Sequence, residues 1–122
     1  MGVIIALANQ KGGVGKTTTT INLGAYLASG KRKVLIVDLD PQGNTSSGLG
    51  VRKEELTSDL YDVLVDGAPA QSIIMKTDVD GLSLLPASAV LAAAEIELVG
   101  AARREFRLRD ALVDLPYDYI LI

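Results

Sequence analysis

The chain has 122 residues, of which 48% are hydrophobic and 22% charged, and its formal net charge is −3. It is long and apolar enough to bury the core of one domain, which excludes an intrinsically disordered tail. It contains no cysteine, which excludes disulfides, thiolate metal sites and iron–sulfur ligation in this stretch, and no histidine, the commonest general base near neutral pH. The acidic balance argues against a globally basic nucleic-acid binder, although a local basic patch stays open.

Four short, almost continuous apolar runs are predicted to be strands. They are residues 3–8, 34–37, 82–85 and 119–122. Runs of this kind are typical of strands that are buried on both faces of a parallel sheet. The first run is too short to span a membrane and has no basic segment before it, so we expect neither a signal peptide nor a membrane helix there.

Helix-like stretches alternate with these runs. The predicted helices are residues 16–29 with Gly30 as C-cap, a short helix opened by residues 58–60, a turn after Pro69, and residues 87–99 and 105–115. The Gly/Ser/Thr-rich residues 43–50 are predicted to be a loop. This alternation predicts an α/β fold, a mostly parallel sheet flanked by helices, in which residues 1–122 lie in a single domain without an internal boundary.

A phosphate-binding loop is the strongest motif in the chain. Its residues are Lys11, Gly12, Gly13, Val14, Gly15, Lys16, Thr17 and Thr18. The loop follows a predicted strand and opens a predicted helix, the context in which glycines let backbone N–H groups turn towards phosphates at a helix N-terminus. Lys16 can reach the β- and γ-phosphates, and the Thr17 hydroxyl is placed to ligate Mg²⁺. The alternative, a glycine-rich turn with solvated lysines, fits the combined spacing and context poorly.

Two carboxylates end the second predicted strand. Asp38 and Asp40 alternate along the chain and therefore share one face at the carboxyl end of that strand. Acids beside a phosphate loop suit Mg²⁺ coordination and the orientation of an attacking water. Taken alone, this segment could equally be an Asp-Pro turn with a capping acid.

The loop departs from the common pattern, because Gln10 stands where the first glycine is expected and Lys11 follows it. The form K-G-G-x-G-K-[ST] resembles the deviant Walker A motif of the ParA/MinD family, whose members are P-loop NTPase-like ATPases. The resemblance implies that Lys11 reaches across an ATP-sandwich dimer to the partner's nucleotide. It also implies that Asp40 positions the hydrolytic water and that Asp38 lies close to the Mg²⁺ shell.

Residues 41–44 and 46–50, together with residues 85–88 and 117–122, resemble the ParA/Soj-like branch that partitions chromosomes and plasmids. This implies a Mg·ATP-dependent homodimer that binds DNA non-specifically through a C-terminal half and is stimulated by a ParB-like centromere-binding protein. It also implies a cytoplasmic protein that associates with the nucleoid when ATP is bound.

The resemblance covers about the N-terminal half of a family member, and residues 119–122 look like a Walker B strand that stops before its aspartate. We therefore expect a truncated sequence whose isolated 122 residues are marginally folded and inactive. Alternatives are a MinD-like membrane-associated positioning ATPase and a fragment without activity of its own. A reductase like the nitrogenase iron protein would need cysteines. The basic residues 31–33 and 103–109 are expected to be solvated faces rather than DNA sites.

Overall fold

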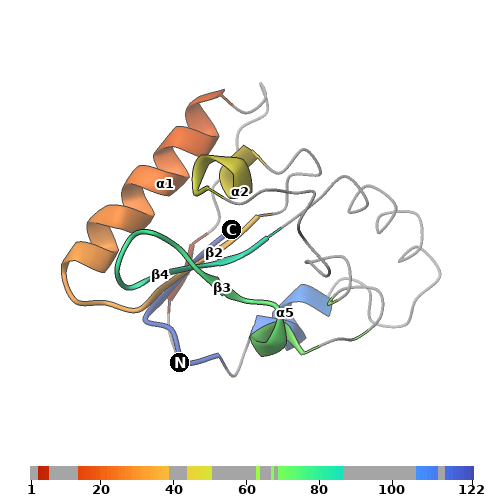
Figure 1. Ribbon diagram of the computed structural model, residues 1–122. Coiled ribbons are helices and arrows are strands. Elements are labelled where there is room, and N and C mark those ends of the chain that lie inside the picture. Colours follow the sequence, from red (N-terminus) through yellow and green to blue (C-terminus); the bar gives the residue numbers. More distant parts are fainter. Residues whose placement is uncertain are drawn as a thin grey trace.

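The computed structural model describes residues 3–5, 14–38, 44–50, 63, 67, 69–86, 107–112 and 115–122. In chain order the elements are β1 (Val3–Ile5), α1 (Val14–Ser29), β2 (Val34–Val37), α2 (Asn44–Gly48), the 3₁₀ helix η2 (Ala70–Ser72), β3 (Met75–Lys76), β4 (Leu82–Leu85), α5 (Arg107–Leu112) and β5 (Tyr119–Leu121). Figure 1 shows these elements arranged around a central sheet.

The strands form one sheet in the order β1-β5-β2-β4-β3. Strands β1, β5, β2 and β4 run parallel, and β3 pairs with β4 in the antiparallel direction. The predicted α/β fold with a mostly parallel sheet is therefore confirmed. Because the parallel strands share a direction, the chain segments that follow them all leave from the same edge of the sheet.

The strand predictions were accurate in the centre of the sheet and weaker at its margins. Residues 34–37 and 82–85 are strands as expected, and β5 ends one residue early, at Leu121. The expectation that every strand is buried on both faces is wrong for β1, because Val3 is 56% and Ile4 48% exposed on a strand whose described neighbour is β5 alone. The short strand β3 was not predicted.

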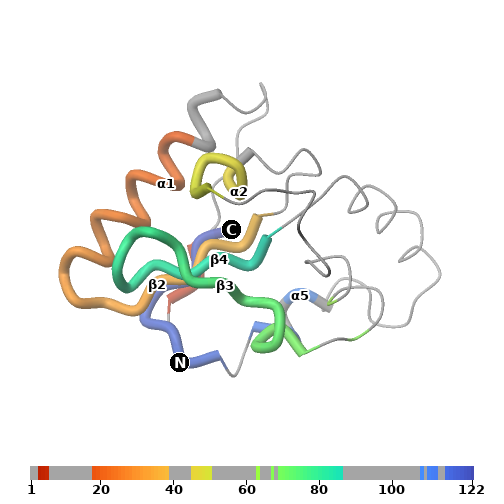
Figure 2. The backbone as a smooth tube through the Cα atoms, in the orientation of Figure 1, coloured from red at the N-terminus to blue at the C-terminus, as the bar shows by residue number. Residues whose placement is uncertain are grey.

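Helix α1 approaches the sheet closely because a glycine lies at the contact. A Cβ atom on Gly24 would lie 3.0 Å from Ile36 Cδ1 and 3.2 Å from Leu82 Cδ1. Thr20, Gly24 and Ala28, spaced four residues apart, form the buried stripe of the helix, as the α-helical period requires. In Figure 2, α1 runs alongside the sheet as the orange tube.

The two faces of the sheet carry separate cores because alternate strand residues point to opposite sides. On one face Val34, Ile36 and Leu84 pack with Ala28 of α1. The other face buries Leu35, Val37 and Leu85, together with Ile73 after η2 and Leu112 of α5, so that α1 and α5 cover opposite sides of the sheet.

Helix α1 ends at Ser29 as predicted and Gly30 follows it, but Gly30 does not supply the left-handed conformation. The residue in the left-handed region is Lys31, with φ of 61°, whereas Gly30 does not have a positive φ. The N–H groups of Gly30 and Lys31 donate to Leu27 O (3.2 Å) and Ala28 O (3.1 Å), so the helix closes with i→i−3 bonds before the chain turns. Residues 31–33 are exposed, as predicted.

Other predicted elements are only partly described. The turn after Pro69 is confirmed as η2, and the helix predicted over 105–115 is described as α5, with Leu115 already outside it. Of the helix opened by residues 58–60 only Val63 is described, and it is helical; the helix predicted over 87–99 lies outside the described residues. Among the described helices, none is long and apolar enough to cross a membrane.

Candidate nucleotide-binding site

The residues predicted to handle phosphate follow two parallel strands of the sheet. The glycine-rich segment follows β1, Asp38 follows β2, and β5 lies between these two strands. In open α/β sheets, ligands bind outside the carboxyl ends of the strands, and the connection from β1 through α1 to β2 passes over β5. The topology therefore brings both predicted segments to one edge.

Helix α1 begins at Val14, two residues earlier than expected. Gly15, Lys16 and Thr17 therefore belong to its first turn, where backbone N–H groups have no partner within the helix. Together with the positive end of the helix dipole, such N–H groups favour an anion. Thr18, one residue further along, is exposed.

Part of the predicted site lies outside the described residues. This applies to Lys11, Gly12, Gly13 and Asp40, and to the side chains of Val14, Gly15, Lys16 and Thr17, whose backbone alone is described. Their roles remain predictions.

Asp38 is the described acid at this edge. Its N–H donates to Leu85 O over 3.1 Å, which continues the pairing of β2 with β4 by one residue. The residue is only 3% exposed. Its carboxylate oxygen Oδ2 accepts two hydrogen bonds from one residue, from Ser46 N at 2.9 Å and from Ser46 Oγ at 2.7 Å. A buried carboxylate needs such donors, because leaving a buried charge without hydrogen bonds is costly.

Ser46 is the site residue that sequence reasoning missed, because residues 43–50 were predicted to be a loop. That prediction is wrong for Asn44–Gly48, which form helix α2. Ser46 N lies in the first turn of α2, where an N–H lacks an intrahelical acceptor, and the Asp38 carboxylate supplies one. Asn44 and Thr45 are residue types that favour helix N-termini, and they could have indicated this helix. The loop was predicted because the whole stretch is rich in Gly, Ser and Thr.

Helix α2 packs against α1 near the same edge (Figure 1). A Cβ atom on Gly48 would lie 2.7 Å from Ile21 Cδ1, so the two helices touch with little space between them. Asp38, α2 and the first half of α1 therefore form one packed unit at the carboxyl edge of the sheet.

The described carboxylate at this edge fits a magnesium ion that also binds a nucleotide. The Asp38 carboxylate offers oxygen ligands of the kind that Mg²⁺ prefers, whereas the hydroxyl group of Thr17, the second predicted ligand, lies outside the described residues. Among the described residues, no group of three or more acids lies close enough to hold a metal ion without help. Mg²⁺ is commonly held by one or two protein oxygens together with substrate phosphates, which matches this small donor set.

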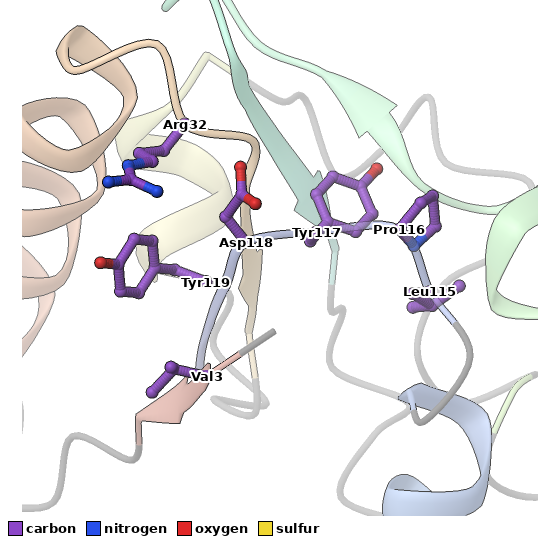
Figure 3. A pocket seen from close by; sticks show the side chains of 7 residues that line it. All are labelled: Val3, Arg32, Leu115, Pro116, Tyr117, Asp118 and Tyr119. Carbon is purple, nitrogen blue, oxygen red and sulfur yellow. The ribbon is translucent and has the colours of Figure 1, made fainter. Parts of the chain in front are cut away.

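A cavity of about 390 Å³ lies at the opposite edge, around the start of β5. Figure 3 shows the side chains of Arg32, from the turn before β2, and of Asp118 and Tyr119 around it. The other lining residues are Val3, Leu115, Pro116 and Tyr117. This cavity is at the amino ends of the strands and is separate from the predicted phosphate site.

Comparisons with known proteins show the family to which the chain belongs. A family model described as an AAA domain matches residues 2–122. The sporulation initiation inhibitor protein Soj of Bacillus subtilis is 56% identical over 124 residues, an alignment that covers 100% of this chain and 49% of Soj. The chromosome partitioning protein ParA of Myxococcus xanthus is 52% identical over 124 residues, which cover 100% of this chain and 44% of that protein. The chain thus spans about half the length of the curated relatives it matches.

A solved structure shows the same fold. The cobyrinic acid a,c-diamide synthase of Mycobacterium smegmatis, with a bound ATP analog and magnesium, superimposes with a TM-score of 0.94 at 41% identity. The match covers 100% of this chain and 50% of that one. With the family model matched over almost its whole length, the chain belongs to the AAA-domain family, and the predicted resemblance to the ParA/Soj-like branch of the ParA/MinD family is confirmed by its similarity to Soj and ParA.

Proposed function

We propose that the protein is a Mg·ATP-dependent ATPase whose nucleotide state switches a homodimer in chromosome or plasmid partition. The observation that carries the proposal is the start of α1 at Val14, which puts the first turn of a 16-residue helix directly after the glycine-rich loop. That turn lies at the same edge of the sheet as the buried Asp38. The bound ATP analog and magnesium of the similar M. smegmatis structure support the same chemistry.

Each predicted residue has a part in phosphoryl transfer. Residues 11–18 surround the phosphates with backbone N–H groups, and Lys16 neutralises charge on the β- and γ-phosphates. Thr17 and Asp38 would hold Mg²⁺, which offsets the charge that develops on the phosphate oxygens. Asp40 orients the attacking water. The chain has no histidine, so the strongest base at hand is a carboxylate and unstimulated hydrolysis is expected to be slow.

The switch depends on Lys11. By its place in the deviant loop, Lys11 contacts the nucleotide of the second protomer, so that the dimer forms around ATP and falls apart after hydrolysis. A cation supplied from outside the site stabilises the transition state of phosphoryl transfer, as an arginine finger does. The ATP-bound dimer would bind DNA non-specifically, and a ParB-like protein would stimulate its hydrolysis.

The deciding experiment measures nucleotide binding in the protein expressed from its complete reading frame. Lys16→Ala removes the phosphate-binding charge and should abolish binding of a fluorescent ATP analogue in the presence of Mg²⁺. Lys33→Ala is the matched control, because Lys33 is an exposed lysine at the opposite edge of the sheet and should bind as the wild type does. Equal binding by the two variants would refute the nucleotide site.

A second variant tests the switch. Asp40→Ala should bind ATP but not hydrolyse it, and should accumulate as a dimer in sedimentation or light-scattering measurements. Asp80→Ala, which removes an exposed acid in the turn before β4, is the control. Hydrolysis at the wild-type rate by Asp40→Ala would show that another group orients the water.

The MinD-like membrane alternative and an inactive fragment remain open predictions. DNA cosedimentation that requires ATP supports partition, whereas ATP-dependent binding to anionic vesicles without DNA binding supports the membrane switch. Comparison of the 122-residue chain with the product of the complete reading frame decides whether this stretch alone retains turnover.

A further inference from the structure

The hydrogen-bonded pair of Asp38 and Ser46 links two elements that the candidate site uses. Ser46 has no exposed surface, and Asp38 is 3% exposed. Both bonds from Ser46 end on the same oxygen, Oδ2, at 2.9 Å from N and 2.7 Å from Oγ. Two hydrogen bonds to the same oxygen restrict the rotation of the planar carboxylate more than one bond would. Because both donors belong to Ser46, the orientation of the carboxylate depends on this residue.

The pair also connects the end of β2 to helix α2. At one end, Asp38 N is bonded to Leu85 O, which anchors residue 38 to the sheet. At the other end, Ser46 belongs to α2, and α2 is packed on α1 through Gly48 and Ile21.

We propose that Ser46 is a positioning residue of the ATPase site. It orients the Asp38 carboxylate towards the magnesium shell and joins the end of β2 to α2 at this edge. This inference rests on the proposed function, because it presumes that Mg·ATP binds at this edge. It adds a residue in α2 to a site otherwise composed of the phosphate loop and the two acids.

Two variants on the same helix test the role. Ser46→Ala removes the hydroxyl donor and keeps the backbone N–H, whereas Ser47→Ala makes the same chemical change on the neighbouring, exposed serine. Groups that orient metal ligands through hydrogen bonds typically contribute about 10- to 100-fold to metal affinity or activity. We therefore expect Ser46→Ala to need about tenfold more Mg²⁺ for half-maximal binding of a fluorescent ATP analogue, and Ser47→Ala to behave as the wild type.

Steady-state kinetics give the second readout. At saturating Mg²⁺, Ser46→Ala should lower kcat about tenfold while KM for ATP changes less than threefold, because the phosphate loop itself is intact. Ser46→Cys keeps a weak donor of similar size and should recover part of the Mg²⁺ affinity; it also serves as the test if Ser46→Ala does not fold. A purely structural serine would lower thermal stability and leave the Mg²⁺ dependence unchanged.

The outcomes separate the two proposals. If the wild type binds ATP with Mg²⁺ and Ser46→Ala shows the same Mg²⁺ half-saturation and kcat, the positioning role is wrong and the proposed function stands. If Ser46→Ala and Ser47→Ala are impaired equally, the effect belongs to α2 as a whole and the specific role of Ser46 is overturned. If the wild type shows no Mg²⁺-dependent ATP binding, the proposed function fails and this inference fails with it.

Discussion

The two edges of the sheet use the same kind of hydrogen bond in different environments. At the carboxyl edge, Asp38 accepts a bond from Ser46 N at 2.9 Å, and both residues are buried. At the amino edge, Asp118 Oδ2 accepts one from Lys33 N at 2.8 Å, and both residues are exposed. Each acid lies just outside a strand and accepts a backbone N–H. The two sites differ in burial and in a second bond at the carboxyl edge, where Ser46 Oγ also donates to Asp38 over 2.7 Å.

Burial changes what each bond contributes. Water can replace a lost partner at the exposed Lys33 N, but cannot readily do so at the buried Ser46. The amino edge has compensating bonds as well, since Asp118 N donates to Lys33 O and Asp118 O accepts from Val3 N. The carboxyl edge thus has a rigid, enclosed acid where the phosphate site is proposed, and the amino edge has a solvated brace that ties three strand ends together.

The largest expected effect comes from the buried acid. Asp38→Ala removes a charged acceptor and leaves the N–H and hydroxyl group of Ser46 without it, which should cost about 3 kcal/mol of unfolding free energy. Urea unfolding of the variant measures the loss. Asp38→Asn keeps an acceptor oxygen and should lose less. A loss below about 1 kcal/mol for Asp38→Ala would mean that water reaches Ser46 and that the two edges do not differ as described.

The turn into β4 at the amino edge should be the next most sensitive position. Gly81 has φ of 83°, a conformation that a side chain disfavours, and a Cβ atom there would lie 3.2 Å from Arg32 O. Gly81→Ala should therefore cost about 1–2 kcal/mol, read from the midpoint of urea unfolding. Gly67→Ala is the control for backbone strain alone, because Gly67 has φ of 72° with nothing within 4 Å of its Cβ position. Equal losses of unfolding free energy in the two variants would show that crowding at Arg32 O adds nothing to the cost of backbone strain.

The exposed acid should matter less than its buried counterpart. Asp118→Ala should cost about 0.5–1 kcal/mol, because the Lys33 N–H regains water when the carboxylate is removed. Thermal unfolding of Asp118→Ala and Asp38→Ala side by side gives the ratio of the two losses in stability. If Asp118→Ala proves as damaging as Asp38→Ala, the brace at the amino edge, rather than burial, dominates the stability of the sheet.

The smallest expected effect is a gain in stability. Lys31 occupies the left-handed region with φ of 61° and is exposed, so Lys31→Gly relieves backbone strain without removing a buried side chain. The expected stabilisation is about 0.5 kcal/mol, because the higher chain entropy of glycine in the unfolded state offsets part of the relief. Calorimetry can detect it as a slightly higher Tm, with Lys33→Gly as a control. A lower Tm would show that the turn tolerates Lys31 without strain.

The central strands illustrate how far local sequence can predict this fold. Residues 34–37 are apolar on both sides of the pleat, and so are residues 82–85 apart from Ser83. Such runs are typical of strands covered on both faces, so the positions of these two strands could be predicted from the sequence. Val3 and Ile4 have the same composition and yet are exposed, because neighbours in the sheet, rather than residue type, determine burial. Strand β3 has only two residues, which are too few to show an alternating sequence pattern.

The candidate site also has one part that the sequence predicts and another that depends on the tertiary structure. The order of glycines and lysines in residues 11–18 and the spacing of Asp38 and Asp40 fit the chemistry of phosphate and Mg²⁺, which acts over a few consecutive residues, so the sequence alone is enough to predict a site there. Helix α2 and the role of Ser46 depended on the tertiary structure. A Gly/Ser/Thr-rich stretch forms a helix here because a carboxylate eight residues earlier accepts its N–H and because α1 packs against it. Neither contact leaves a local pattern, so the sequence by itself determined the residue types from which the chemistry of the site is predicted, and the packing of β2, α1 and α2 decided how its buried acid is held.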